Sequence, residues 1–347
     1  MASATREPPP PLTADDARGL AQRAASAEGL GHWDAAARLY SLAFRASVLD
    51  RDMSAAADAL RGQARVRSQQ RRFDEAEELA ALSLEIAERH GHRQSAARAM
   101  NVLGIVRYWV GDWDGARALY ARALDLALDL GDDELAGLAC QNAGVIAHLQ
   151  GDLREARNLY LESVGSFVRS GNSANAMMAY NNLGTVSVYL GEWMEAEVYI
   201  SRGIEIGERL SHSPVLARLY SNRAQALLQI GETARAQASL EKAERAARVV
   251  GDHATLAEVE KFRGMQARLE GRLDDAERYL LHALEMGEGA ATEFERAEMT
   301  RELGLLREAQ QRRDEAAELY ARAAESFRSV GARHHSRATE ERLAALR

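Results

Sequence analysis

The pattern of apolar and polar residues repeats along nearly the whole sequence. Apolar residues recur at spacings of three and four, which is the periodicity of amphipathic helices, in segments such as GDWDGARALYARALDLALDL, residues 111–130. Similar segments begin every forty residues, at positions 31, 71, 111, 151, 191, 231, 271 and 311. A fixed period of this size is typical of solenoids built from stacked supersecondary units. The pattern therefore predicts eight consecutive helix-turn-helix repeats.

Three columns of small residues run through these repeats. We call the first residue of each segment its anchor position, and small residues stand seven before it, five after it and twelve after it. The column five after the anchor is alanine throughout: Ala36, Ala76, Ala116, Ala156, Ala196, Ala236, Ala276 and Ala316. A large residue such as Trp33, Phe73 or Trp113 often stands two after the anchor. Such columns predict places where helix backbones approach each other closely.

Small residues at these three positions, a glycine at the turn and an aromatic residue two positions later resemble the tetratricopeptide repeat, an antiparallel helix pair. The resemblance covers residues 14–347 and implies an all-α, right-handed superhelix, with eight repeats in residues 13–331. The period departs from the usual one of about 34 residues. Longer repeats of this kind resemble those of kinesin light chains, Pins-type adaptors and sensor arrays of bacterial regulators.

The two ends of the chain differ from the repeats. Residues 1–12, MASATREPPPPL, lack apolar periodicity, so we expect a disordered or polyproline-like tail. Residues 332–347 contain a partial ninth unit, which predicts a C-terminal capping helix because a solenoid needs a polar outer face at its end.

Composition restricts the classes of partner. A net charge of −8 argues against general nucleic-acid binding, because the phosphate backbone requires a basic surface. We find no signal peptide and no transmembrane run, which predicts a cytoplasmic protein without a membrane partner. Only Lys242 and Lys261 are lysines among 44 basic residues, a bias that we expect of a GC-rich bacterial genome.

The sequence carries no recognisable catalytic motif. It has no P-loop, no G-x-G-x-x-G fingerprint, no H-E-x-x-H and no C-x-x-C. The single cysteine, Cys140, occupies a repeat column that normally packs, so we interpret it as a buried structural thiol. We therefore predict no enzyme activity, no cofactor and no metal site.

The resemblance implies that the first helix of each pair lines a concave groove, through positions 13, 10, 9, 6, 3 and 2 before the anchor. Among the eighteen residues that this rule selects in the third to fifth repeats, only Arg98 is fully charged. We select a peptide-binding set from them: Arg98, Asn101, Ile105, Tyr108 and Trp109 in the third repeat, Gln141, Asn142, Val145 and His148 in the fourth, and Asn181, Asn182, Thr185 and Tyr189 in the fifth.

Asn101, Gln141 and Asn181 recur at forty-residue intervals and give this groove its polar character. Carboxamides both donate and accept hydrogen bonds, so they suit the backbone of a bound peptide, while aromatic residues cover its side chains. The alternative is that these residues are buried between repeats, or pack on the tail or on a second copy of the chain.

Charged residues flank the predicted groove. Arg61 and Arg65 lie one helical turn apart and form a possible contact for a carboxylate or phosphate, although solvated arginines are an equal alternative. The seventh and eighth repeats present a mixed-sign set that we expect to be solvated or ion-paired: Glu258, Lys261, Arg268, Glu298, Arg301 and Glu308. The Lys and Asn pattern with which co-chaperone repeats hold a C-terminal carboxylate is not matched at Val102 and Leu138.

The favoured hypothesis is a non-enzymatic adaptor that binds a peptide or protein segment in the concave groove. One alternative is a regulator that senses a small peptide or metabolite and controls a partner. Another is a structural array that associates with itself through the apolar groove, because contiguous apolar surface commonly marks an interface.

Overall fold

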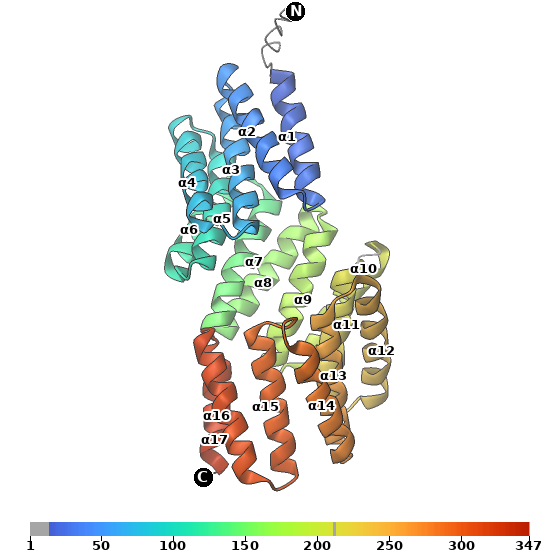
Figure 1. The fold of residues 1–347 in the computed structure, drawn as a ribbon. Coiled ribbons are helices and arrows are strands. Elements are labelled where there is room, and N and C mark those ends of the chain that lie inside the picture. The colour runs from blue at the N-terminus through green and yellow to red at the C-terminus, as the bar shows by residue number, and fades with distance from the viewer. Residues whose placement is uncertain (1–13, 211–212, 347) are drawn as a thin grey trace, which may run out of the picture. The chain divides into compact units, whose positions relative to one another are not determined.

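A computed structural model describes residues 14–210 and 213–346, and this part of the chain consists of α-helices joined by short turns, without a strand (Figure 1). The helices are α1 (Ala14–Gly29), α2 (Trp33–Leu49), α3 (Met53–Gln69), α4 (Phe73–Arg89), α5 (Arg93–Trp109), α6 (Trp113–Leu130), α7 (Asp133–Gln150), α8 (Leu153–Ser170), α9 (Ser173–Tyr189), α10 (Trp193–Leu210), α11 (Ser213–Gln229), α12 (Thr233–Val250), α13 (His253–Leu269), α14 (Leu273–Gly287), α15 (Glu293–Ala309), α16 (Arg313–Ser329) and α17 (Arg333–Leu346).

Consecutive helices pack against each other as pairs, beginning with α1 and α2 and ending with α15 and α16, and α17 packs on α16. The first helices of neighbouring repeats also contact each other, as α3 does with α5 and α13 with α15. The predicted all-α fold of stacked helix pairs is therefore confirmed. The proline-rich tail that we expect in residues 1–12 lies outside the described residues.

The turns between helices use a left-handed backbone residue at regular intervals. Gly131 follows α6 with a φ of 66°, and its amide donates to the carbonyl oxygen of Leu128, so it ends the helix in the conformation that glycine adopts at no steric cost. Arg71 takes the same conformation with a φ of 58°. The twenty-residue spacing of these turns sets helices of nearly equal length.

The small-residue columns form the contacts within and between pairs. All eight alanines five positions after the anchor are completely buried. The glycine seven before the anchor lies beneath a large residue nine after it, a partner that the sequence analysis did not identify. A Cβ atom on Gly104 would lie 2.5 Å from the ring of Tyr120, and one on Gly304 would lie 2.7 Å from Tyr320. The small columns therefore set how closely the helices pack.

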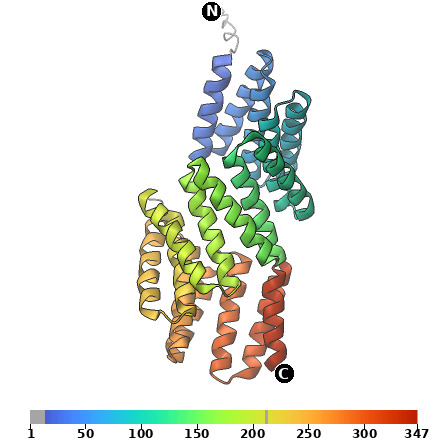
Figure 2. The same ribbon diagram turned by 180° about the vertical axis from the view of Figure 1, so that it is seen from behind.

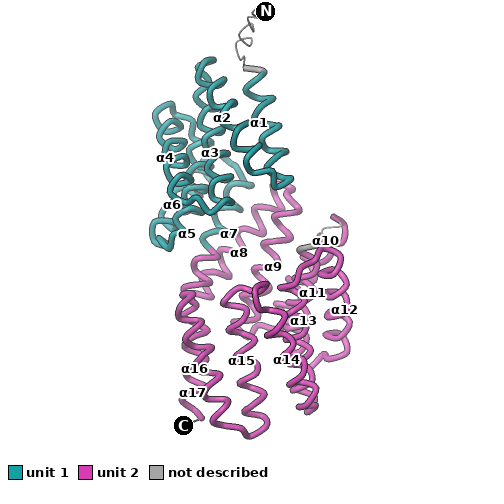
Figure 3. Tube along the Cα trace, viewed as in Figure 1, with its two compact units in different colours: residues 1–143 teal, residues 144–347 magenta. Residues whose placement is uncertain are grey.

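The described chain divides into two compact units, residues 1–143 and 144–347, with the boundary inside α7 (Figure 3). Unit 1 contains the first three pairs and the beginning of α7, and unit 2 contains the remaining pairs and α17.

Unit 2 brings its first and last residues together. A Cβ atom at Gly151, in the turn after α7, would lie 3.2 Å from the Cβ of His334 on α17. The reverse view also shows the end of α7 and the beginning of α8 beside the C-terminal helices (Figure 2). The turn between α7 and α8 therefore lies against α17, the last helix of unit 2.

Candidate functional site

Two cavities lie side by side along the first helices of unit 1. The larger has a volume of about 500 Å³ and is bounded by α1, α2 and α3, and the smaller, of about 280 Å³, is bounded by α3, α5 and the beginning of α7. Arg61 and Arg65 on α3 line both cavities. We call the two cavities together the unit 1 groove.

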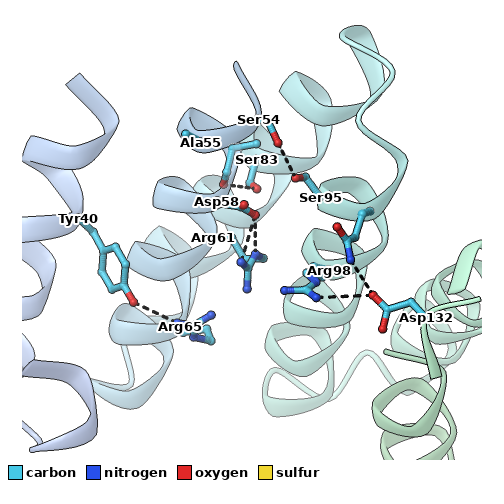
Figure 4. Close-up of polar contacts among 12 residues, drawn as sticks. Tyr40, Ser54, Ala55, Asp58, Arg61, Arg65, Ser83, Ser95, Arg98 and Asp132 are labelled. Atoms are coloured by element: carbon cyan, nitrogen blue, oxygen red, sulfur yellow. Dashed lines mark hydrogen bonds and ion pairs between the residues drawn. The ribbon is translucent and has the colours of Figure 1, made fainter. Parts of the chain in front are cut away.

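Arg65 is held by an ion pair with another repeat of unit 1. Its Nε donates to Oε1 of Glu28 at 2.9 Å, its Nη2 donates to Oε2 at 2.8 Å, and the Tyr40 hydroxyl completes the arrangement by donating to Oε2 at 2.7 Å. Burial opposes ionisation of Glu28, but Arg65 outweighs it and lowers the pKa of that carboxyl. Figure 4 shows the contact between Arg65 and Tyr40. The charge of Arg65 is thus compensated by Glu28, which contacts it through both carboxylate oxygens.

Arg61 is less well compensated. Its Nε and Nη2 both reach the same oxygen of Asp58, Oδ1, at 3.3 and 3.1 Å. Only 16% of the Arg61 side chain is exposed, against 45% for Asp58. Burial lowers the pKa of Arg61, and the positive charges of Arg65 and Arg98 lower it further. Arg61 is therefore a buried cation whose one counter-ion does not fully compensate its loss of hydration.

Arg98 approaches the same space from α5. Its Nη2 lies 3.5 Å from Oδ2 of Asp132, and Nε2 of Gln94 donates to the same oxygen at 2.9 Å. Asp132 has a second role as the N-terminal cap of α7, because its Oδ1 accepts from the amide of Leu135. Figure 4 shows the guanidinium groups of Arg61 and Arg98 turned toward each other from α3 and α5. Arg61 and Arg98 thus bring positive charge into the groove, and each is paired with an aspartate, Asp58 or Asp132.

Two of the predicted carboxamides are engaged by the next repeat. Asn101, only 7% exposed, lines the smaller cavity, and its Oδ1 accepts from Nδ2 of Asn142 at 3.0 Å. In unit 2 the same bond joins Asn181 to Asn222, at 2.9 Å. These contacts fit the alternative in which the carboxamides connect repeats. They leave the peptide contact of Asn101 and Asn181 a prediction.

The remaining predicted residues of the third and fourth repeats are partly buried or exposed. Ile105 lines the smaller cavity, whereas Trp109 is 53% exposed and stacks on Phe73 with ring centroids 6.4 Å apart, and Tyr108 meets its edge. Within the described part of the chain, the buried Oε1 of Gln141 has no hydrogen-bond partner.

Predicted residues of unit 2 lie among its own buried side chains. The hydroxyl of Tyr189 donates to Oε1 of Glu298 at 3.0 Å, and the ring of Tyr189 meets that of His335 with centroids 4.5 Å apart. His148 lies beside both rings, with centroids 5.3 Å from Tyr189 and 6.5 Å from His335. Lys261 Nζ donates to the other Glu298 oxygen at 3.0 Å. We call these five residues the buried polar cluster.

The buried polar cluster combines a charged pair with neutral histidines. Burial would raise the pKa of Glu298, but Lys261 and Arg301 outweigh it and hold that pKa well below its usual range. Burial lowers the pKa of His148 to about 4 and that of His335 to about 3. Among the described residues, the buried Nε2 of His335 has no hydrogen-bond partner.

The mixed-sign set of the seventh and eighth repeats is ion-paired, as expected, although two members are far from solvated. Lys261 and Glu298 are only 2% and 4% exposed. Burial raises the pKa of the neighbouring Glu258 to about 7. The solvated alternative is wrong for this pair. Arg268 pairs with Glu302, and Glu308 with Arg342.

The other predicted residues of unit 2 are partly buried on its first helices. The Thr185 hydroxyl donates to the carbonyl oxygen of Asn181 and accepts from Asn222, whereas Val145 and Asn182 are half-buried. Their role in binding stays a prediction.

Sequence reasoning missed Glu28 and Asp58, which pair with Arg65 and Arg61 respectively. Side chains on neighbouring first helices meet at spacings of 37 or 41 residues, as Glu28 does with Arg65, Lys261 with Glu298 and Asn101 with Asn142. These spacings are three residues shorter and one residue longer than the forty-residue repeat. A search for opposite charges 37 residues apart detects the Glu28–Arg65 pair.

A third cavity of unit 1, about 400 Å³, lies among α4, α5 and α6. Its arginines, Arg93 and Arg122, are more than half exposed and pair with surface carboxylates. It lacks the buried, incompletely paired cation that distinguishes the unit 1 groove.

Comparison with known families identifies the repeats. A family model described as tetratricopeptide repeat matches residues 95–166 and 175–249. Together with the small-residue columns and the stacked helix pairs, this match defines the class. Residues 95–166 and 175–249 are therefore tetratricopeptide repeats. A comparison with curated protein sequences gives no match.

Solved structures with similar folds include regulators of the Rap type. A Rap protein complexed with competence and sporulation factor aligns with a TM-score of 0.60 at 11% identity, over 96% of this chain and all of that one. The Rap conjugation gene regulator of the plasmid pLS20 in complex with the Phr* peptide gives 0.58 at 15%, over 80% and 75%. Aspartyl phosphate phosphatase F from Bacillus subtilis gives 0.59 at 13%, over 78% and 70%. At these identities the likeness shows a shared fold.

None of the helices that the structure describes has the length and apolar character needed to cross a membrane. Nor do three or more histidine, cysteine, aspartate or glutamate side chains in residues 14–210 and 213–346 form a group that would hold a metal ion.

Proposed function

We propose that this protein is a non-enzymatic adaptor whose unit 1 groove binds an extended segment of a peptide or partner protein. The observation that carries the proposal is the pair of adjoining cavities that share Arg61 and Arg65. Their volumes are of the order that small-ligand and peptide sites require, about 300–1,000 Å³.

The lining of the groove supports a peptide rather than a strongly polar small molecule. Val102, Ile105, Leu135 and Leu138 give the smaller cavity an apolar wall, and the larger one is bordered by alanines and by polar residues such as Gln22 and Ser54. Apolar walls with a few convergent polar groups are the usual composition of a site that buries side chains and fixes their orientation. The predicted residues Arg98, Asn101 and Ile105 belong to this lining.

A peptide-sensing regulator is the second candidate, and the fold shared with a Rap regulator in complex with a Phr* peptide favours it. In that case the bound segment is a signal, and the response is a changed interaction with another protein. Compaction on peptide binding, measured by solution X-ray scattering, distinguishes this candidate from a simple adaptor.

A selection from a displayed library of random heptapeptides tests the proposal on the full chain. The double variant Ile105→Gln and Leu138→Gln removes apolar contacts from the smaller cavity, and we expect it to retain at least tenfold less peptide than the wild type. The matched control is Leu82→Gln with Leu128→Gln, which changes two exposed leucines of α4 and α6. Equal retention by wild type and groove variant, at equal helicity, would show that binding lies elsewhere.

A further inference from the structure

The proposal that follows rests on the proposed function and concerns what the unit 1 groove recognises. Arg61 is the most buried of the groove arginines on α3 and α5, with 16% of its side chain exposed against 34% for Arg65 and 40% for Arg98. Among the described residues it forms an ion pair with Asp58, a half-exposed aspartate on its own helix. A buried guanidinium normally has planar, two-oxygen contacts with its counter-ion.

We propose that Arg61 binds an acidic side chain in the middle of an extended peptide, and that Asp58 is the counter-ion which this side chain replaces. Arg65 does not take that role because Glu28 already binds it through both oxygens. Arg98 supplies further positive charge from the opposite side of the smaller cavity.

The position of Arg61 between two cavities makes the acid internal rather than terminal. The larger cavity extends from Arg61 toward α1, and the smaller one extends toward α5 and α7. A C-terminal carboxylate on Arg61 would leave one cavity without peptide. An internal aspartate or glutamate lets the chain continue into both.

The walls of the two cavities indicate the residues on either side of the acid. Ala17, Ala21, Ala25, Ala43 and Ala59 line the larger cavity beside polar residues such as Gln22, Ser47 and Ser54, and the small alanines leave room for a peptide side chain. Leucine, isoleucine and valine line the smaller cavity together with Glu134, which suits an apolar side chain. The recognised segment is therefore an acid with an apolar residue on the side that faces α5 and α7.

Asp58 is suited to being displaced. Its side chain is 45% exposed, so the carboxylate regains water when it leaves Arg61. An i, i+3 pair that is partly exposed contributes little stability, so a two-oxygen contact from a bound acid competes with it. Removing the Asp58 charge should therefore strengthen binding, which a merely structural pair would not do.

The experiment uses the immobilised full chain and three libraries of heptapeptides with random flanking positions. The first has aspartate at its centre and capped ends, the second has asparagine at its centre and capped ends, and the third has asparagine at its centre and a free C-terminal carboxylate. Retained peptide is measured by mass spectrometry for wild type, Arg61→Gln, Arg61→Lys and Asp58→Asn. The control is Arg122→Gln, which removes a half-exposed surface arginine of α6.

We expect the wild type and the Arg122→Gln control to retain about tenfold more of the aspartate-centred library than of the other two. Arg61→Gln should abolish the preference, Arg61→Lys should keep part of it, and Asp58→Asn should increase retention several-fold. Retention without acid preference, or a preference that survives Arg61→Gln, overturns this inference but leaves the peptide groove standing. A preference for the free C-terminus overturns the internal position. If no library is retained, the proposed function fails as well.

Discussion

The first helices of unit 1 and those of unit 2 have the same repeat geometry but opposite uses of charge. In unit 1, Arg61 faces a cavity and is paired on one side only. In unit 2, Lys261 stands at the equivalent repeat position, and its ammonium is buried against Glu298. The first arrangement leaves a cation for a ligand, and the second satisfies a cation from within the chain.

The difference follows from what surrounds each cation. His335 on α17 lies against Tyr189 and Phe294, so the C-terminal helix contributes a side chain to the surroundings of Glu298, whereas α3 and α5 of unit 1 border an open cavity. The comparison teaches that repeat position alone does not define a binding residue. Whether a residue at that position can bind a ligand depends on whether another residue of the chain already pairs with it.

The largest expected effect is the loss of Lys261. Lys261→Ala leaves Glu298 buried without its main counter-ion, so we expect the free energy of unfolding to fall by about 3–5 kcal/mol. Urea unfolding measures this. The chain's other lysine is the matched control, because Lys242 is half-exposed in its pair with Glu208 and Lys242→Ala should cost at most about 1 kcal/mol. Equal costs for the two variants would contradict the description of the buried polar cluster.

An intermediate effect concerns His335 and pH. The folded-state pKa of about 3 lies below the unfolded value of about 6.5, so the unfolded chain binds a proton that the folded chain excludes. The stability that the neutral histidine contributes is present above about pH 6.5 and is lost as the pH falls toward 3.

The variant His335→Phe removes this proton uptake. Relative to the wild type, it should therefore gain about 2 kcal/mol between pH 7 and pH 5. Glu258 takes up protons in the opposite sense, because burial raises its pKa to about 7, but it does so in both proteins and cancels in the difference. Thermal unfolding at the two pH values provides the comparison, and a constant difference would place His335 in water.

A further comparison separates Arg65 and Arg61, the two groove arginines on α3. Arg65→Gln breaks a two-oxygen pair with Glu28, so we expect it to lower the free energy of unfolding by about 1.5–3 kcal/mol. Arg61→Gln removes an incompletely paired cation and should change it by less than about 1 kcal/mol. Chemical denaturation of both variants tests the contrast. A larger cost for Arg61→Gln would mean that Asp58 compensates it fully.

The sequence predicts the fold well because the residues that pack within each helix pair recur at the same positions in every repeat. The alanine column and the forty-residue period are local consequences of helix pairs, and both are confirmed. The small column seven before the anchor was also predicted, but its partners Tyr120 and Tyr320 were missed, although they stand four residues after the alanine column, at the aromatic position of the repeat signature.

The site was only partly predictable for a physical reason. Arg61, Arg98 and Asn101 follow from repeat positions, and they line one cavity. The contact of Tyr189 with Glu298 spans 109 residues and depends on how several helix pairs accumulate their rotation. No local pattern encodes that sum, so the contact of α17 with Tyr189 emerges only from the structure.

Hydrogen–deuterium exchange of the full chain, with and without a selected acid-centred heptapeptide, tests the central claim most directly. We predict that bound peptide protects amides of α3 and α5 and leaves α13 and α15 unchanged, because Lys261 on α13 is already paired with Glu298 on α15. Protection of α13 and α15 with no change in α3 would contradict the account.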